Sequence, residues 1–395
     1  MNTVIVGGGF AGVRAALEIS KKNLGKVTLI SDEDYFLHHA TLYSTATGRS
    51  KAESVVPLSE IFKNHPDVKV VKDRISAIDP ERRLVNGKIK HYKYDKLVMA
   101  IGVVTTYFNI NGMKEHSYGI KTLGEVEKFN NHLHKELIRD NHLDRNYIVI
   151  GGGPTGVELA GALATYLQRI AVAHHLKRAK AKVTLVEAAP RILPRLSEAA
   201  SAKVSKKLKD IGVKVLVNHK VEALDDDYIV IDGKKMPTQT AVWTSGVTNH
   251  PFFKQHDDIF KLAPNGRVEV NEYLEAYRDI YVIGDNANTK FTGVAWNALD
   301  DATFIAKHLA RTAAHQPLVA RKPTAPPSGI PVTEDWAYVE WKGTYLIGRA
   351  GAWARRQIEL YGYRQLLPAR AAHKAWKAHH VYDESCRLCK KPRGF

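Results

Sequence analysis

Apolar residues occur along the chain in two patterns. Some form short continuous runs, which are typical of buried strands, and others recur with helical spacing. Residues 3–6 form the first short run, and a glycine-rich turn, a helical stretch and a second apolar run at residues 26–30 follow it. This order of elements is typical of a parallel sheet covered by helices. The pattern therefore predicts an α/β fold.

The same order recurs in the middle of the chain. Residues 147–150 form a short apolar run that leads into a second glycine-rich turn and helical stretch, and residues 182–187 form the next strand. Residues 94–102 and 241–247 are the apolar runs with which each unit is expected to end. The sequence therefore predicts two units of the same class.

Each glycine turn has the spacing of a dinucleotide fingerprint in its proper context. Gly7 permits a tight turn, Gly9 lets the backbone approach a pyrophosphate, and Gly12 allows the helix to pack closely on the strand. Gly151, Gly153 and Gly156 repeat this spacing. The N-terminus of the helix in each unit would add free N–H groups and a positive dipole end.

Glu187 closes the second strand of the second unit, where an acid can accept both ribose hydroxyls and repel a 2′-phosphate. This favours NADH over NADPH. Several basic residues nearby in sequence can offset that repulsion: Lys177, Arg178, Arg191 and Arg195. The first unit has Ser31 at the strand end, so Asp32 or Glu33 must act there.

A third signal assigns the cofactors. Residues 279–283 form an apolar strand that ends in Gly284 and Asp285, and this carboxylate can bind a ribityl hydroxyl of FAD. A strand this late must return to the first unit, so the second unit is inserted in the first. The predicted fold is α/β with two Rossmann-like domains: residues 1–112 and 243–320 for FAD, 113–242 for NADH, and a small C-terminal domain at 321–395 with an amphipathic basic tail.

These motifs resemble the two-dinucleotide-binding-domain flavoproteins and, among them, the type II (non-proton-pumping) NADH dehydrogenases, over roughly residues 1–350. The specific marks are residues 27–35, 42–48, 151–160 and 243–247. The resemblance implies FAD contacts at Gly7, Gly9, Phe10, Ala11, Gly12, Asp32, Thr47, Ile75, Ala100, Gly102, Asp285 and Ala295. For NADH it implies Gly151, Gly153, Thr155, Gly156, Glu158, Glu187 and Gly246.

The resemblance also implies a reaction in which NADH passes hydride to FAD and a quinone or other acceptor then takes the electrons. Glu158 is expected near the nicotinamide, with helix capping as its structural alternative. The family's quinone motif falls on residues 295–300, where both glutamines are replaced. The catalytic candidates are therefore Glu158, Ala295, Trp296 and Asp300. Trp296 can stack on a quinone, block it, or simply pack in the core.

Cysteine occurs only at positions 386 and 389, so a disulfide framework and the cysteine-dependent reductases of this superfamily are excluded. The Cys386 and Cys389 pair has the spacing of a redox pair, or of half a zinc site that His379 and His380 would complete. We favour an ordinary tail and expect no metal.

The net charge of +17 is concentrated in residues 349–395, where aromatic residues alternate with basic ones. No apolar run is long enough to span a membrane, and Met1 leads directly into a strand. We expect a cytoplasmic protein that is peripheral on the inner face of the membrane. It would dock on anionic lipid through a stripe of Trp353, Ile358, Leu360, Tyr361, Leu366 and Leu367.

Several alternatives stay open at this point. They are a soluble reductase that serves a small acidic redox protein, an FAD-binding protein whose tail binds nucleic acid, which we consider unlikely, and a solvated basic face. A homodimer is possible.

Overall fold

The first unit is built on a six-stranded sheet. The computed structural model describes residues 1–140, 146–175 and 182–383. The sheet has the order β19-β20-β9-β1-β2-β5. All its strand pairs are parallel except the edge pair β19–β20. The strands are β1 (Asn2–Val6), β2 (Lys26–Ser31), β5 (Val68–Lys72), β9 (Lys96–Met99), β19 (Glu275–Tyr277) and β20 (Ile280–Val282).

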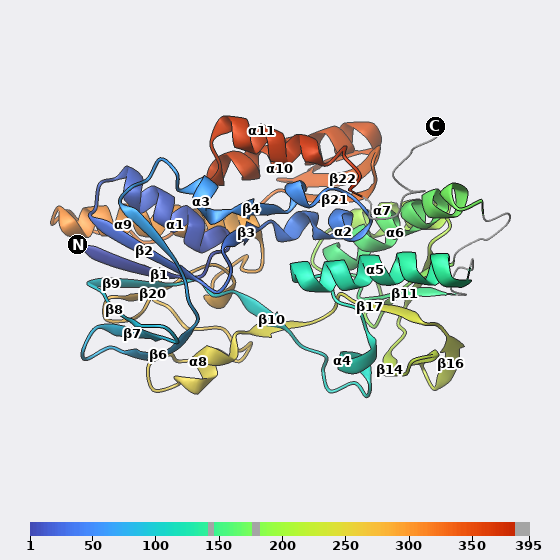
Figure 1. Cartoon of the computed structure of the whole chain (residues 1–395), viewed down its shortest axis with the longest axis horizontal. Coiled ribbons are helices and arrows are strands. Elements are labelled where there is room, and N and C mark those ends of the chain that lie inside the picture. The colour runs from blue at the N-terminus through green and yellow to red at the C-terminus, as the bar shows by residue number, and fades with distance from the viewer. Residues whose placement is uncertain (141–145, 176–181, 384–395) are drawn as a thin grey trace.

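The second unit is built on a four-stranded parallel sheet of order β13-β12-β11-β17. Its strands are β11 (Tyr147–Ile150), β12 (Val183–Glu187), β13 (Lys214–Val217) and β17 (Thr240–Trp243). The helices of this unit are α5 (Leu123–Asp140), α6 (Pro154–Ala173) and α7 (Glu198–Asp210). The two sheets lie side by side in Figure 1.

The predicted nesting of the units is confirmed by the pairing of β20 with β9, in which Ile280 lies opposite Leu97. The chain leaves the first sheet through β10 (Val103–Thr105) and returns through β18 (Val247–Asn249), and these two strands pair antiparallel. Figure 1 shows β10 crossing between the two sheets. The helices α1 (Phe10–Lys21) and α9 (Ala295–Ala313) pack against each other on the first sheet.

Smaller elements complete both units. In the first unit they are β3 (Tyr35–Leu37), α2 (Leu42–Ala46), β4 (Val55–Pro57), α3 (Leu58–Ile61), β6 (Ile75–Asp79), β7 (Leu84–Gly87), β8 (His91–Lys93) and α8 (Pro251–Gln255). In the second they are α4 (Met113–His116), β14 (Val221–Leu224), β15 (Tyr228–Ile231) and β16 (Lys234–Pro237). Three 3₁₀ turns are η1 (His39–Thr41), η2 (Lys51–Glu53) and η3 (Gly284–Asn286).

The C-terminal part forms a layer over both units, as Figure 1 shows along its upper edge. It consists of β21 (Ser328–Thr333), β22 (Trp336–Trp341), β23 (Thr344–Ile347), α10 (Gly348–Leu366) and α11 (Ala369–Ala378). Val332 of β21 comes so close to α6 that a Cβ on Gly161 would lie 2.1 Å from its carbonyl oxygen. Tyr363 of α10 donates a 2.5 Å hydrogen bond to the carbonyl of Glu53. This layer therefore holds the two units together.

The expected lipid-facing stripe on α10 is wrong. Leu360, Leu366 and Leu367 are buried, and the last two belong to the core of the first unit. Helical spacing of apolar residues indicates that one face of the helix is buried. Here that face is buried against protein and not against lipid. Trp353 and Tyr361 are exposed, as expected. Among the described residues, no helix is long and apolar enough to cross a membrane.

Candidate functional site

The first glycine turn has the close approaches that the fingerprint requires. Gly7 has φ +117°, and a Cβ there would lie 2.1 Å from the carbonyl oxygen of Ala100. A Cβ on Gly12 would lie 1.9 Å from the carbonyl oxygen of Gly7. Gly9 at the N-cap of α1 meets nothing within 4 Å. The turn is thus tight at both ends and open at its middle, where a phosphate group fits.

The first turn of α1 supplies backbone donors to that open space. Phe10 begins the helix, and its ring packs edge-on against Phe36 at 5.0 Å. Ala11 is buried, and Val13 makes the first helical bond back to Gly9 at 3.0 Å. The N–H groups before Val13 have no partner within the helix, which is the usual arrangement for binding an anion.

The strand end of the first unit differs from the family pattern, as predicted. Ser31 is buried, and its hydroxyl accepts a 3.3 Å hydrogen bond from the N–H of Glu33. A Cβ on Gly8 would lie 2.4 Å from this hydroxyl, so the serine occupies the space beside the turn. Asp32 is exposed next to it, which leaves its carboxylate accessible to a ribose.

The Gly284–Asp285 turn lies across the sheet from the glycine turn, at the end of β20. Its backbone is held by Asp301, whose carboxylate accepts a 3.0 Å hydrogen bond from the N–H of Gly284. Asn286 is fully buried and exchanges hydrogen bonds with both backbone groups of Gly102, at 2.8 and 2.6 Å. Asn286 therefore joins the Ala100–Gly102 turn to the Asp285 turn. The sequence analysis missed this role, although the residue follows Asp285 directly.

Lys121 lies near both His39 and Asp285. The His39 side chain is accessible to solvent, yet surrounding protein lowers its pKa to about 4. Burial also lowers the pKa of Lys121, while the charges of Asp285 and Glu125 partly oppose this. Lys121 was not predicted as a site residue, since no motif marks it.

These residues fit FAD. The Asp285 carboxylate makes no hydrogen bond within the part of the chain that the structure describes, so it can accept from a ribityl hydroxyl. The open space at Gly9 suits the pyrophosphate, and His39 and Lys121 offer polar groups to a flavin ring.

Two further predicted FAD contacts lie at the edges of this region. Thr47 follows α2, and its buried hydroxyl donates within that helix to the carbonyls of Tyr43 and Ser44. The hydroxyl hydrogen of Thr47 is therefore used within the helix, so a flavin contact there would use the backbone or the acceptor capacity of the hydroxyl oxygen. Ile75 begins β6 of a small three-stranded sheet and is half-buried.

The second glycine turn repeats the first closely. Gly151 has φ +113°, and a Cβ on Gly156 would lie 1.8 Å from the carbonyl oxygen of Gly151. Gly153 again has nothing within 4 Å. Thr155 is exposed in the first turn of α6. Gly246, with φ +76°, lies between β17 and β18, and a Cβ there would lie 2.6 Å from the ring of Phe108.

Glu187 is held in place at the end of β12. One carboxylate oxygen accepts from the N–H of Gly152 at 2.6 Å, and the other accepts from the N–H of Ala189 at 2.7 Å. Each oxygen retains a lone pair for a ribose hydroxyl. Arg191 is bound to the carbonyls of Leu193 and Pro194 at 3.1 and 2.9 Å, so it is not available to a 2′-phosphate. Lys177 and Arg178 lie outside the described residues.

Glu158 lies just past the first turn of α6, which contains no acidic residue, and is buried. Burial raises the pKa of its carboxyl to about 8, while Arg355 lowers it and Glu359 raises it further. The carboxyl is therefore largely protonated at neutral pH. Its position beside Arg355 and Glu359 of α10 could not be read from any motif.

The first turns of α9 carry the other catalytic candidates. Ala295 begins the helix, and Trp296 stacks on Tyr361 of α10 with ring centroids 5.3 Å apart. Asp300 lies 3.5 Å from Arg321. Arg321 also forms a closer pair with Asp301 at 2.5 Å. The Asp300 carboxylate thus takes part in holding the 314–327 segment to α9.

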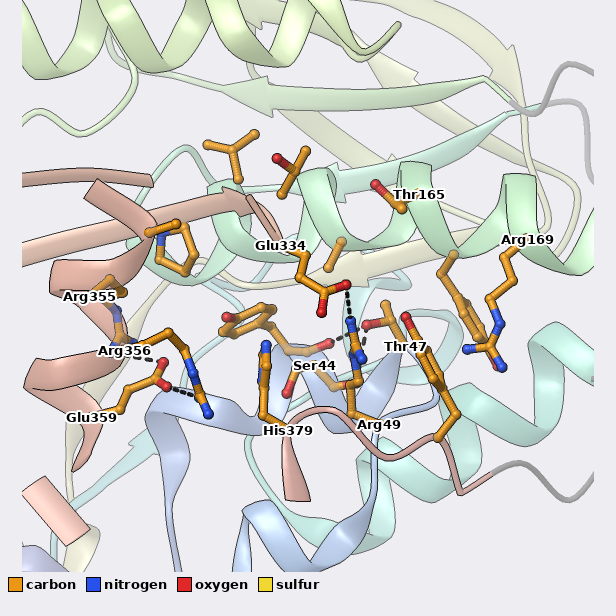
Figure 2. A pocket seen from close by; sticks show the side chains of 18 residues that line it. Ser44, Thr47, Arg49, Thr165, Arg169, Glu334, Arg355, Arg356, Glu359 and His379 are labelled. Atoms are coloured by element: carbon orange, nitrogen blue, oxygen red, sulfur yellow. Dashed lines mark hydrogen bonds and ion pairs between the residues drawn. The ribbon is translucent and has the colours of Figure 1, made fainter. Parts of the chain in front are cut away.

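A cavity of about 90 Å³ lies where the two units meet the C-terminal layer. Figure 2 shows the side chains around it, which come from α2, α6, β21, α10 and the chain after α11. Most of its charges are paired: Arg49 with Glu334 at 2.9 Å, and Arg355 with Glu359 at 2.9 Å. His379 contacts the fully buried Glu53 at 2.7 Å. The cavity is therefore surrounded by an ion network that connects three parts of the fold.

The candidate zinc ligands named from the sequence all lie near the C-terminus. Cys386 and Cys389 lie outside the described residues. His379, their suggested partner, is paired with Glu53, and His380 lies 3.4 Å from Glu334. Within residues 1–140, 146–175 and 182–383, no group of three potential metal ligands comes together.

Comparison with protein families gives a match over most of the chain. A model described as pyridine nucleotide-disulphide oxidoreductase matches residues 1–302. That stretch contains no cysteine, so the disulphide chemistry in the family description has no reacting group here. Type II NADH:quinone oxidoreductases of Staphylococcus epidermidis and Staphylococcus aureus are each 28% identical to the chain. Both alignments cover 71% of the chain and 73% of the relative.

Solved structures share the fold across nearly the whole chain. NDH2 from Plasmodium falciparum in complex with NADH superposes with a TM-score of 0.86 at 18% identity, covering 96% of the chain and 97% of the other. The sulfide:quinone oxidoreductase from Aquifex aeolicus superposes with a TM-score of 0.77 at 19% identity, covering 94% and 92%.

Proposed function

The chain belongs to the pyridine nucleotide-disulphide oxidoreductase family, and we propose that it is an FAD-dependent NADH dehydrogenase that reduces a quinone. The overall reaction is NADH + H⁺ + quinone → NAD⁺ + quinol. Bound FAD would accept the hydride and pass on its two electrons. We further propose the division into residues 1–112 with 243–320 for FAD, 113–242 for NADH, and 321–395.

The observation that carries this proposal is the pair of matching glycine turns. Gly9 and Gly153 both leave open space at a helix N-terminus, and both are flanked by glycines that admit no side chain. One chain thus offers two sites for a dinucleotide phosphate. The Asp285 turn lies beside the first site only, which supports FAD there and NADH at the second.

The ring-binding region between the two sites needs no general acid or nucleophile for hydride transfer. The chain's contribution is to position the two rings and to exclude water between them. The neutral Glu158 carboxyl keeps a negative charge away from the rings at neutral pH. Glu187 favours NADH, since both of its oxygens are oriented toward a ribose by backbone donors.

A quinone is the acceptor that the relatives' names suggest, and the N-terminus of α9 is the place where we propose it reaches the flavin. The stacked pair of Trp296 and Tyr361 there presents aromatic surface, which suits a planar ring. The staphylococcal relatives are named for NADH and quinone. The site residues given in the sequence analysis are all part of this proposal.

We propose that the protein docks on the inner face of an anionic membrane through a surface of which the sequence singled out only Trp353. This apolar rim consists of Trp341, Tyr345, Leu346, Ile347 and Trp353, all of them exposed. Lys342 lies over the ring of Trp341 at 4.7 Å, and Lys203 lies over that of Tyr345 at 5.3 Å. Aromatic rings beside lysines suit a negatively charged lipid surface.

Anaerobic titration tests the proposal. NADH should bleach the flavin absorbance of the purified holoprotein, and a short-chain quinone should restore it. A soluble one-electron protein acceptor serves as the comparison. A flavin that NADH does not bleach would refute the dehydrogenase, and restoration by the protein acceptor alone would replace the quinone.

A further inference from the structure

Two arginines from different units converge on one point beside Gly293, just before α9. Arg195 lies in the loop between β12 and α7, and Arg267 lies in the first unit before β19. A Cβ on Gly293, just before α9, would lie 3.6 Å from Nη2 of Arg267 and 3.9 Å from Nη1 of Arg195. The two guanidinium groups therefore meet beside the loop that leads to the N-terminus of α9.

Each arginine is fixed to the turn of one cofactor site. The loop of Arg195 is bound to the second glycine turn, because the N–H of Leu193 donates to the carbonyl of Gly152 at 2.7 Å. Arg267 donates from Nε to the carbonyl of Asp285 at 3.0 Å, which leaves its terminal nitrogens free to bind elsewhere. The pair thus spans the distance between the NADH turn and the FAD turn.

The positive charges of Arg195 and Arg267 are not balanced by ion pairs within the described residues. Among the described residues, neither Arg195 nor Arg267 lies within ion-pair distance of a carboxylate. Burial lowers the pKa of Arg267, Asp285 opposes this, and the nearby charge of Arg195 lowers it further. A guanidinium group stays charged even so. Two like charges held close together stabilise an anion placed between them.

The dinucleotide itself is the anion that fits this position. If NADH binds at Gly151–Gly156 with its nicotinamide at the flavin, as the proposed function requires, it extends from the second unit to the first. Its diphosphate then lies beside the turn to which the Arg195 loop is bound. We propose that Arg195 and Arg267 form a clamp that binds the diphosphate of NADH from both units. This inference rests on the proposed function.

Equilibrium binding tests the clamp without any redox step. ADP-ribose carries the diphosphate but no nicotinamide, and its affinity for the FAD-loaded protein is measured by calorimetry. Arg195→Gln should weaken ADP-ribose about tenfold, since one charge-assisted contact is lost. Arg195→Lys should weaken it less, because it keeps the charge but not the forked geometry. Arg278→Gln is the matched control, since Arg278 is exposed elsewhere on the first unit.

Measurements of flavin reduction distinguish the loss of the clamp from a general structural effect of the substitution. Reduced nicotinamide riboside has no phosphate, so Arg195→Gln should raise the half-saturating concentration of NADH about tenfold and leave that of the riboside unchanged. Arg267→Lys, checked for full flavin content, should affect the same substrate in the same direction. Equal ADP-ribose affinities in wild type and Arg195→Gln would overturn the clamp, as would equal losses with both reductants. A wild-type flavin that NADH does not bleach would refute the proposed function, while ADP-ribose binding would still decide the clamp.

Discussion

The two dinucleotide units have nearly the same backbone at their glycine turns. The N–H of Gly7 donates to the carbonyl of Ile30 at 2.8 Å, and that of Gly151 donates to Val186, also at 2.8 Å. The first helical bonds match equally well, from Val13 to Gly9 at 3.0 Å and from Val157 to Gly153 at 3.1 Å. The units therefore share one solution for holding a phosphate.

They differ at two side chains in equivalent positions. The residue after the last paired position of the second strand is Ser31 in one unit and Glu187 in the other. Two residues after the last glycine stands Arg14 in the first helix and Glu158 in the second. Arg14 is bound to Glu18 at 3.2 Å and to the carbonyl of Gln365 at 2.5 Å, whereas Glu158 is buried with a raised pKa.

The difference teaches that the backbone of the turn sets the class of ligand, while single side chains around it set which ligand binds and what the site does. Arg14 is part of the contact with α10. Under the proposed function, the second unit keeps an acid at the ribose and another near the rings, which suits a cofactor that must bind and leave.

The largest effect is expected from filling the two turns separately. Gly12→Ala should abolish FAD binding, since its Cβ would meet the Gly7 carbonyl at 1.9 Å. Gly156→Ala should retain FAD but lose NADH-dependent bleaching, by at least a hundredfold, because the clash at 1.8 Å lies in the other unit. The ratio of flavin to protein absorbance and anaerobic bleaching measure the two outcomes.

Gly362→Ala serves as the control for both, because it lies in α10 with nothing within 4 Å. If Gly156→Ala loses flavin while Gly12→Ala retains it, the cofactor assignment is reversed.

Changes at the end of the second strand of each unit, Glu187 and Ser31, give the next largest effect. Glu187→Gln should lower kcat/KM for NADH by roughly tenfold to a hundredfold, since the charge-assisted bonds to ribose are weakened. The same change should raise activity with NADPH, as the repulsion of the 2′-phosphate is removed. Ser31→Ala should alter neither preference. Steady-state assays with both nucleotides check this, and an unchanged NADH-to-NADPH ratio would argue against ribose binding by Glu187.

The pH dependence of flavin bleaching tests the role of Glu158, whose equivalent in the first unit is Arg14. Glu158 is neutral below its pKa of about 8 and ionises above it. The rate of flavin bleaching should fall roughly tenfold between pH 7 and pH 9, because a negative charge beside the rings opposes hydride arrival. Glu158→Gln should remove this dependence, whereas Arg14→Gln should retain it. A wild-type rate that is flat across this range would contradict the assignment.

The same shift has a consequence for stability. The usual pKa of a glutamate is near 4.5, so between that value and about 8 the unfolded chain ionises Glu158 while the fold keeps it neutral. The free energy of unfolding therefore decreases as pH rises through this window. Denaturant titrations of wild type and Glu158→Gln at pH 5 and pH 8 measure the difference, which should be smaller for the variant.

The smallest effect on chemistry is expected at the apolar rim, which belongs to neither unit. The double substitution of Trp341→Ser and Trp353→Ser should reduce co-sedimentation with anionic vesicles severalfold. Bleaching by NADH should be unchanged. Replacement of the half-buried Trp376 is not equivalent, because its indole nitrogen donates to the carbonyl of Arg356 at 2.9 Å. Undiminished vesicle binding in the double variant would place the docking surface elsewhere.

The sequence predicted the fold well because its signals are local. Glycine spacing, the apolar strands and the late Gly284–Asp285 strand each depend on a few adjacent residues, and the nesting follows from their order. The α10 stripe failed for the opposite reason. Spacing reveals that Leu360, Leu366 and Leu367 are covered, but the covering surface comes from residues far away in the chain.

Site residues divide in the same way. Gly7, Gly151, Glu187 and Asp285 could be predicted, since each occupies a fixed place in a motif. The approach of Lys121 to Asp285 and the convergence of Arg195 with Arg267 could not, because they form only when separate units pack together. Asp300 was chosen by alignment to a motif, and its contact with Arg321 depends on a loop that no motif describes.

The pairing of β20 with β9 also sets an order for biosynthesis. During translation, residues 147–243 leave the ribosome before β20 exists, and they contain every strand of the second sheet. All four strands of that unit can therefore pair while the first sheet still lacks the strand that carries Asp285 at its end, but its core is completed only later by Ile330, Val332 and Tyr338 of the C-terminal layer. A truncated chain that ends before β20 would leave an open sheet edge beside β9, and we expect such a chain to aggregate.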